Sequence, residues 1–279
     1  CHSAGPSTVE DGEFKGQTLE QVWENHKEIC GTNGNKFEFF PILIKFIDAK
    51  NNLSIQVHPD NDYAMRVEGE YGKTEAWYIL DCDEGAELIL GFNREVSVEE
   101  FKKAAQSEEM LNIVNKVKVK KGDLFFIESG TLHAICKGIL LAEVQQNSNT
   151  TYRVYDYGRV GADGKPRALH IDKAADVTKL CPPTITNASE REVEKQDGGT
   201  RTHLTECDLF KMYSVETDGE YVSEAGDESF VSLLCLDGSA EVVCGKKTLG
   251  MKKGESLFIP ASSGEFKIIG KTHMLETRI

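Results

Sequence analysis

The sequence lacks three features that define large classes of proteins. None of its eight cysteines forms a Cys-x-x-Cys pair, so a zinc finger or a thioredoxin-type redox site is not expected. The best candidate for a membrane-spanning run, residues 139–142, falls far short of the roughly 20 residues that such a helix needs. Basic residues are scarce, because 32 Lys and Arg stand against 46 Asp and Glu, for a net charge of −14. We therefore expect neither membrane insertion nor nucleic-acid binding.

The start of the sequence and its cysteines bear on location. No basic segment followed by an apolar core stands at the N-terminus, so no signal peptide is expected. The chain begins at Cys1 rather than Met and in a polar stretch, and we expect further residues upstream. Most cysteines lie among apolar neighbours, which predicts buried free thiols in a reducing compartment. These features together predict a cytoplasmic protein.

Hydrophobic periodicity predicts a mainly β protein with a few helices. Helical spacing predicts helices at about 17–30 and 97–115, the second opening on a capping box of Ser97 and Glu100. A short third helix is expected near 172–180. Elsewhere, short apolar runs separated by Gly and Asp are typical of a sandwich or barrel. The predicted strands are 41–48, 53–57, 75–81, 86–91, 117–120, 124–127, 139–146, 209–215, 230–236, 239–244 and 256–259.

Residues 122–135 and 254–268 follow the same pattern. Each copy begins with Gly, an acidic residue and an apolar strand, passes through a Gly turn and enters another strand. Such a repeat predicts a hairpin of one design used in two related β-barrels. Only the first copy carries a histidine after its turn, His133. A functional site that uses this histidine is therefore expected in the first barrel and not in the second.

Four side chains with oxygen or nitrogen donors could meet inside that barrel. Gln56 and His58 are two residues apart, so on a strand they share a face. Glu75 begins a later strand, and His133 follows the Gly130 turn. Two imidazoles, a carboxylate and an amide oxygen would form a metal site with open positions. Taken singly, a histidine or the glutamate also fits an ordinary surface or capping position, whereas Gln56 in an apolar strand is harder to explain because a buried amide needs partners. The set therefore depends on a wider pattern.

That wider pattern resembles a known family. Residues 122–133 resemble the second cupin motif, with Glu128 where Pro is usual. The segments 56–60 (Gln-Val-His-Pro-Asp), 73–78 (Lys-Thr-Glu-Ala-Trp-Tyr) and 129–135 (Ser-Gly-Thr-Leu-His-Ala-Ile) are similar to the type I phosphomannose isomerases, in their short bacterial form. Residues 41–49 and 150–159 are also typical of that family.

The resemblance implies a double cupin fold, two jelly-roll β-barrels with a few helices. We expect a catalytic cupin domain at 1–181, with helical insertions and a truncated N-terminus. Residues 182–204, rich in Pro, Thr, Asn, Glu and Gly, are expected to be a linker. Residues 205–279 are expected to form a second, metal-free cupin-like domain. The sequence leaves the oligomeric state open.

The resemblance also implies a role for individual residues. The expected ligands of one Zn²⁺ per chain are Gln56, His58, Glu75 and His133. The family's active-site positions fall on Lys73, Glu143 and Arg153. Arg159 is the residue expected to bind the substrate phosphate. Without the resemblance, Lys73 reads as a loop lysine, Glu143 as a solvated residue, and the two arginines as partners of Asp156 or of nearby tyrosines.

The implied reaction is the aldose–ketose isomerisation of mannose 6-phosphate and fructose 6-phosphate through an enediol intermediate. Arg153 would stabilise the developing negative charge, and Lys73 or Glu143 would transfer protons. Lys73 would be a better base if zinc and Arg153 depressed its pKa. Three alternatives stay open: an Fe(II)-dependent cupin oxygenase, a non-catalytic sugar-binding or regulatory cupin, and an isomerase of another sugar phosphate. The expected partner is a small sugar phosphate in each isomerase case.

Overall fold

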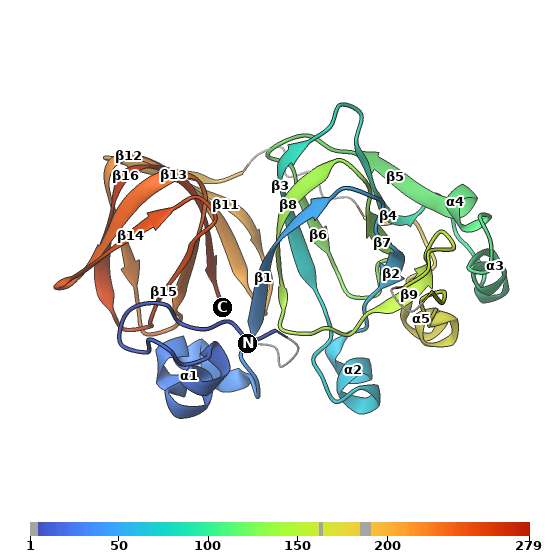
Figure 1. The fold of residues 1–279 in the computed structure, drawn as a ribbon, viewed down its shortest axis with the longest axis horizontal. Coiled ribbons are helices and arrows are strands. Elements are labelled where there is room, and N and C mark those ends of the chain that lie inside the picture. Colours follow the sequence, from blue (N-terminus) through green and yellow to red (C-terminus); the bar gives the residue numbers. More distant parts are fainter. Residues whose placement is uncertain (1–4, 162–163, 185–190) are drawn as a thin grey trace. The chain divides into compact units, whose positions relative to one another are not determined.

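The computed structural model describes residues 5–161, 164–184 and 191–279, and its chain falls into two compact units (Figure 1). One unit comprises residues 43–186, and the other combines residues 1–42 with 187–279. This division differs from the expected domain limits. The N-terminal segment clusters with the C-terminal unit, and strands β10 (Val193–Gln196) and β11 (Gly199–Glu206) occupy much of the expected linker. Residues 185–190 of that linker lie outside the described part of the chain.

The unit of residues 43–186 is built from two antiparallel sheets (Figure 1). A four-stranded sheet has the order β1-β8-β3-β6, and a five-stranded sheet has the order β5-β4-β7-β2-β9. The strands are β1 (Ile42–Ala49), β2 (Ile55–Val57), β3 (Glu75–Cys82), β4 (Glu87–Phe92), β5 (Val114–Lys118), β6 (Leu124–Ile127), β7 (His133–Ile135), β8 (Ile139–Gln146) and β9 (Tyr152–Tyr155). The predicted mainly β character is confirmed.

The five-stranded sheet has an apolar core on each face. On one face, Ile55 and Val57 pack with residues of the helices α3 (Val98–Ala104), α4 (Met110–Ile113) and α5 (Ile171–Val177). On the other face, Ile135 packs with residues of the four-stranded sheet, among them Trp77. Because side chains alternate along a strand, the residue between Ile55 and Val57 points away from the helices. That residue is Gln56.

The predicted helices are shorter than expected. In place of one helix at 97–115, α3 and α4 are separate, and β5 begins at Val114, which pairs with Phe92 of β4. The β-branched residues of 114–118 therefore join a sheet edge rather than extend the helix. The segment 17–30 forms α1 (Leu19–Asn25) and the 3-10 turn η1 (Lys27–Cys30), followed by η2 (Thr32–Lys36). The sequence analysis did not anticipate α2 (Asn61–Val67).

The other unit contains a seven-stranded antiparallel sheet with a core of its own. Besides β10 and β11, its strands are β12 (Lys211–Ala225), β13 (Val231–Cys244), β14 (Lys247–Lys252), β15 (Ser256–Ile259) and β16 (Gly264–Arg278). The strands predicted at 230–236 and 239–244 are one strand, β13, with a register shift between Cys235 and Asp237. Gly238 has φ +75°, and a Cβ there would lie 2.2 Å from the carbonyl oxygen of Lys271, so only glycine fits beside the shift.

The repeated segments each provide two strands, but they are not hairpins as predicted. The first copy supplies β6, which pairs with β3, and β7, which pairs with β2 and β4. The second supplies β15, which pairs with β13, and β16, which pairs with β12 and β13. Each copy thus distributes its strands among other partners, as the chain of a jelly roll does when it crosses between sheets.

Two smaller expectations can be compared with the structure. The seven cysteines within the described residues are free thiols, but only Cys30 and Cys235 are buried, and Cys181 is exposed. Within the same residues, every helix is too short or too polar to span a bilayer.

Candidate metal centre

Strand pairing brings three of the predicted residues to one face of the five-stranded sheet. Gln56 on β2 lies opposite His133 of β7 on one side and opposite Arg153 of β9 on the other. Residues directly opposite one another in antiparallel strands share a face. The side chains of Gln56, His133 and Arg153 therefore project to the face that turns away from the helices.

The turns that flank these strands hold the other ligands in place. The amide of Gly130 donates to the carbonyl of His58 (2.8 Å), which ties the end of β2 to the turn before His133. Gly130 has φ +83°, and a Cβ there would lie 2.8 Å from the carbonyl oxygen of Val177, so the turn requires glycine. The amide of Lys73 donates to the carbonyl of Pro59 (3.0 Å), which places the residues before β3 next to His58.

His58, Glu75 and His133 meet at one buried point. The Nε2 atom of His133 lies 3.4 Å from Oε1 of Glu75, and Nε2 of His58 lies 3.7 Å from Oε2 of the same carboxylate. One ligand atom from each residue lies within 4.8 Å of the others, and each side chain is at most 1% exposed. Gln56 joins them, with its Nε2 position 3.4 Å from Nε2 of His133.

Both imidazoles are oriented by backbone carbonyls. Nδ1 of His58 is 2.8 Å from the carbonyl oxygen of Thr150, and Nδ1 of His133 is 2.9 Å from that of Thr131. A proton on each Nδ1 satisfies these contacts and leaves the Nε2 lone pair facing the carboxylate. Imidazoles that bind metals are held in this way.

Burial shifts the pKa values of the ligands in opposite directions. Desolvation, together with the positive charge of Lys73, holds the pKa of His58 well below its usual value. Desolvation lowers the pKa of His133 to about 4. Desolvation and the charge of Glu143 raise the pKa of Glu75 to about 7, although Lys73 opposes them. Near neutral pH both imidazoles are thus neutral, as metal ligands must be, and the carboxylate is close to losing its proton.

The donor set fits a divalent metal ion. Nε2 of His58 and Oε1 of Glu75 are buried and make no hydrogen bond, and Oε2 of Glu75 has only its ion pair with Lys73. Leaving such atoms without partners is costly, and a cation among them would satisfy all three. Mixed imidazole and carboxylate donors suit Zn²⁺ and other first-row metals better than Ca²⁺ or Mg²⁺, which prefer oxygen alone.

Lys73 and Glu143 lie beside this cluster. Nζ of Lys73 is 3.1 Å from Oε2 of Glu75, and the side chain is 6% exposed. Burial lowers the pKa of Lys73, but the carboxylates of Glu75 and Glu143 raise it, and the outcome is a pKa above the usual value. The depressed pKa expected for this lysine therefore depends on the charge of a metal ion.

Glu143 is held in the barrel by two donors. Nε1 of Trp77 donates to one of its oxygens (3.0 Å), and Nζ of Lys45 donates to the other (3.2 Å). Trp77 and Glu143 are opposite one another on β3 and β8, and Glu75 precedes Trp77 by two residues, so all three share a face. Burial raises the pKa of Glu143, but Lys73 and Lys45 lower it, and the net pKa is below normal. The alternative interpretation, in which the Glu143 side chain faces solvent, is therefore wrong.

The two predicted arginines differ in their surroundings. Nη1 of Arg153 donates to the carbonyl of Ala168 (2.9 Å), while its buried Nε makes no hydrogen bond. Arg159 pairs with the carboxylate of Asp156, and Nη1 of Arg159 donates to the carbonyl of Asn52 (2.7 Å). The same carboxylate also pairs with Arg167. The structure thus brings Arg153 to the face of the ligands, and shows Arg159 in an ion pair.

The sequence analysis missed several supporting residues. Lys45 donates to Gln145 (2.5 Å) as well as to Glu143, and Trp77 packs edge-on against the ring of His133. Both lie in the motifs quoted above, but nothing in their spacing says that they contact Glu143. Thr131 and Thr150 act through backbone carbonyls, which any residue carries, so their roles leave no signal in the sequence.

Comparison with known proteins adds an independent line of support. The model described as phosphomannose isomerase type I, catalytic domain, matches residues 1–93, and that described as mannose-6-phosphate isomerase, cupin domain, matches residues 200–278. Mannose-6-phosphate isomerase ManA of Bacillus subtilis is 40% identical over 272 residues, which cover 97% of this chain and 84% of that protein. The chain belongs to the type I phosphomannose isomerase family.

Other relatives agree with this assignment. The mannose-6-phosphate isomerase of Streptococcus mutans is 37% identical over 275 residues, covering 99% of this chain and 85% of that protein. The crystal structure of the mannose 6-phosphate isomerase from Bacillus subtilis superimposes with a TM-score of 0.91 at 39% identity, over 100% of this chain and 87% of that one. The predicted family, its isomerase class and the cupin fold are therefore confirmed.

Proposed function

We propose that this phosphomannose isomerase family member interconverts mannose 6-phosphate and fructose 6-phosphate with one bound Zn²⁺. The observation that carries the proposal is the buried convergence of His58, Glu75 and His133, whose free donor atoms face one another. Gln56 would complete the set with its amide oxygen, after a rotation that exchanges the two amide atoms. The substrate is supported by the relatives in Bacillus subtilis and Streptococcus mutans, which are mannose-6-phosphate isomerases.

The reaction requires a proton to move between C2 and C1 of the open-chain sugar, and the enediolate must be stabilised meanwhile. When bound, zinc would supply Lewis acidity for the sugar oxygens. Arg153 has a guanidinium that can place two donors against adjacent oxygens, and its pKa is lowered by desolvation and by the nearby Arg167. It would stabilise the negative charge that develops on O1 and O2.

Lys73 and Glu143 are the candidates for proton transfer. Both are buried beside Glu75, and in the absence of other charges Lys73 is protonated and Glu143 ionised near neutral pH. That pairing offers an acid and a base beside the same carboxylate, as exchange between two carbons and two oxygens requires. Arg159 is proposed to bind the substrate phosphate by exchanging part of its contact with Asp156 for the phosphate oxygens.

A coupled assay tests the proposal directly. Purified protein, loaded with Zn²⁺, should convert mannose 6-phosphate to fructose 6-phosphate far faster than it converts glucose 6-phosphate. Preference for glucose 6-phosphate would indicate a different sugar specificity, and no turnover of either would favour a non-catalytic cupin. Oxygen consumption that requires Fe(II) would favour the oxygenase alternative, for which Lys73 and Arg153 have no evident role. We propose that the enzyme acts in the cytoplasm on this soluble metabolite.

A further inference from the structure

The C-terminal unit carries a polar cluster inside its own core. His203, Tyr213, Glu276 and Leu233 lie opposite one another across β11, β12, β16 and β13. Leu233 belongs to the apolar core of this unit, so the whole row faces that core. Two residues along the same strands, Arg201 lies opposite the core residue Val215. Charged side chains thus occupy positions that apolar residues normally fill.

The cluster is incompletely satisfied. Glu276 is fully buried. One of its carboxylate oxygens, Oε1, accepts hydrogen bonds from both Nη2 of Arg201 (2.6 Å) and Nε of Arg278 (2.7 Å). The other oxygen, Oε2, is buried and makes no hydrogen bond, and the same is true of Nε of Arg201. An acceptor and a donor are therefore both left open. A purely structural ion cluster would be expected to satisfy these atoms, because each unpaired one is costly.

A cavity of about 300 Å³ adjoins the cluster. Arg201 belongs to its wall, along with Tyr221 and Ser223 of β12 and Glu194 and Gln196 of β10. Nη2 of Arg278 lies 3.5 Å from Oγ of Ser223, so the second arginine also reaches the wall. The volume is at the low end for ligand pockets, which limits the occupant to a small molecule.

The charges around the cavity nearly cancel. Arg201 and Arg278 are balanced by Glu276 and Glu194, the latter 3.5 Å from Nη1 of Arg201, and the remaining charge is the exposed Lys195 at the rim. A dianion such as a phosphate would find its positive partners already paired. A neutral ligand that both donates and accepts hydrogen bonds better suits the mixed donors and acceptors of the wall, Arg201, Ser223 and Glu194.

We propose that this cavity binds a small neutral polyhydroxylated molecule, a monosaccharide or polyol, as a second site distinct from the metal centre. Its hydroxyl groups would form hydrogen bonds with Arg201 and Ser223 of the wall, and Tyr221 would supply an aromatic surface for the carbon skeleton. This site makes use of the barrel that carries no predicted metal ligand.

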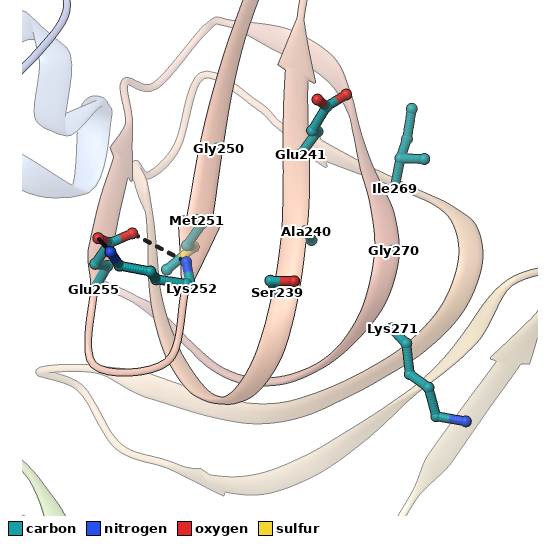
Figure 2. Close-up of a pocket in the computed structure, with 10 residues that line it drawn as sticks. All are labelled: Ser239, Ala240, Glu241, Gly250, Met251, Lys252, Glu255, Ile269, Gly270 and Lys271. Atoms are coloured by element: carbon teal, nitrogen blue, oxygen red, sulfur yellow. Dashed lines mark hydrogen bonds and ion pairs between the residues drawn. The ribbon is translucent and has the colours of Figure 1, made fainter.

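A larger hollow of about 620 Å³ in the same unit lacks these features (Figure 2). It is lined by Ser239, Glu241 and Lys271 on the face away from the core, and these residues are exposed. Lys252 pairs with Glu255 there at 3.6 Å, and Lys271 pairs with Asp218 at 2.9 Å. These charges are solvated and already partnered, so the hollow provides a location for a control substitution.

Methyl signals of methionine can locate the binding. Met274 lies one row from Glu276 in the C-terminal core, and Met110 lies in the core of the other unit. D-Glucose and D-sorbitol, titrated into the zinc-loaded full chain, should move the Met274 signal saturably and leave that of Met110 in place. Ser223→Leu, which fills the cavity, should weaken binding at least about tenfold, whereas Ser239→Leu in the outer hollow should not.

A second variant protects the test against misfolding. Arg201→Lys keeps the positive charge next to Glu276 but removes the forked donor. It should weaken binding, while the Met274 signal of the ligand-free variant keeps the chemical shift of folded protein. The proposal is overturned by the absence of any saturable Met274 shift, by a shift with malonate but not with the polyols, or by equal affinity in Ser223→Leu and the unsubstituted protein.

Discussion

Glu75 on β3 and His133 on β7 belong to different sheets, yet Oε1 of Glu75 lies 3.4 Å from Nε2 of His133. The contact is long for a hydrogen bond, and this oxygen of Glu75 has no hydrogen-bond partner, whereas the other oxygen pairs with Lys73. A gap of this kind between Oε1 of Glu75 and Nε2 of His133 suits a cation that contacts both atoms. The predictions below follow from that relationship.

Replacing His133 with Ala should remove metal and activity together. The substitution deletes a donor that no neighbour can replace, so bound zinc, measured by elemental analysis after dialysis, should fall from about one per chain to near zero. His26→Ala is the matched control, because the His26 side chain is 40% exposed and pairs with Glu28. Retained turnover in metal-free His133→Ala protein would contradict the assigned role.

Replacing Arg153 with Ala should leave the metal in place and slow the reaction. If Arg153 stabilises charge in the transition state, kcat should fall on the order of 10²- to 10³-fold, with little change in KM. Arg159→Ala offers a contrast, since a phosphate contact made equally in substrate and transition state should raise KM instead. Loss of zinc from Arg153→Ala would show that the residue acts on the site's structure.

Metal affinity should depend on pH through Glu75. The pKa of this carboxyl is raised to about 7 in the protein without metal, so at lower pH a proton must leave before the metal binds. Affinity should therefore rise about tenfold per pH unit from pH 5 toward 7 and then level off. The histidines add little to this slope, because the pKa of His133 is about 4 and that of His58 is well below normal. Competition with a chelator measures the slope, and a flat profile would contradict the account.

Replacing Lys45 with Met should move the acid limb of the pH–rate profile to higher pH. The positive charge and hydrogen bond of Lys45 both lower the pKa of Glu143. Without them the pKa of Glu143 should rise, and the ionised carboxylate should be lost at a higher pH. Lys50→Met, at an exposed position just after β1, should leave the limb unchanged. An unshifted limb in Lys45→Met would mean that Glu143 does not control it.

The sequence predicted the convergence of the candidate ligands better than it predicted the strands around them. Gln56, His58, Glu75 and His133 were found because their motifs match a family, and the alternation of β2 places Gln56 away from the apolar core. The strand β9 was missed, since four residues carry too little periodicity to be recognised, and β7 was indicated only by the repeat at 122–135. The cluster around Glu276 was also missed, because its members come from three strands of one unit and only pairing brings them together.

The boundary between the units could not be predicted for a similar reason. Residues 1–42 cluster with a segment that follows them by more than a hundred residues, and such long-range contacts leave no local pattern. Asn33, for example, donates through Nδ2 to the carbonyl of Ile279 (2.9 Å). Turn and linker composition at 182–204 indicated an interruption, but strands β10 and β11 begin inside it.

Metal removal and restoration tests the central claim most directly. The protein is stripped with a chelator, and isomerisation of mannose 6-phosphate is followed as Zn²⁺ is added back in known amounts. We predict that activity falls to background without metal and returns in proportion to zinc, with a break at one ion per chain. Full activity in protein that contains no divalent metal would contradict the account.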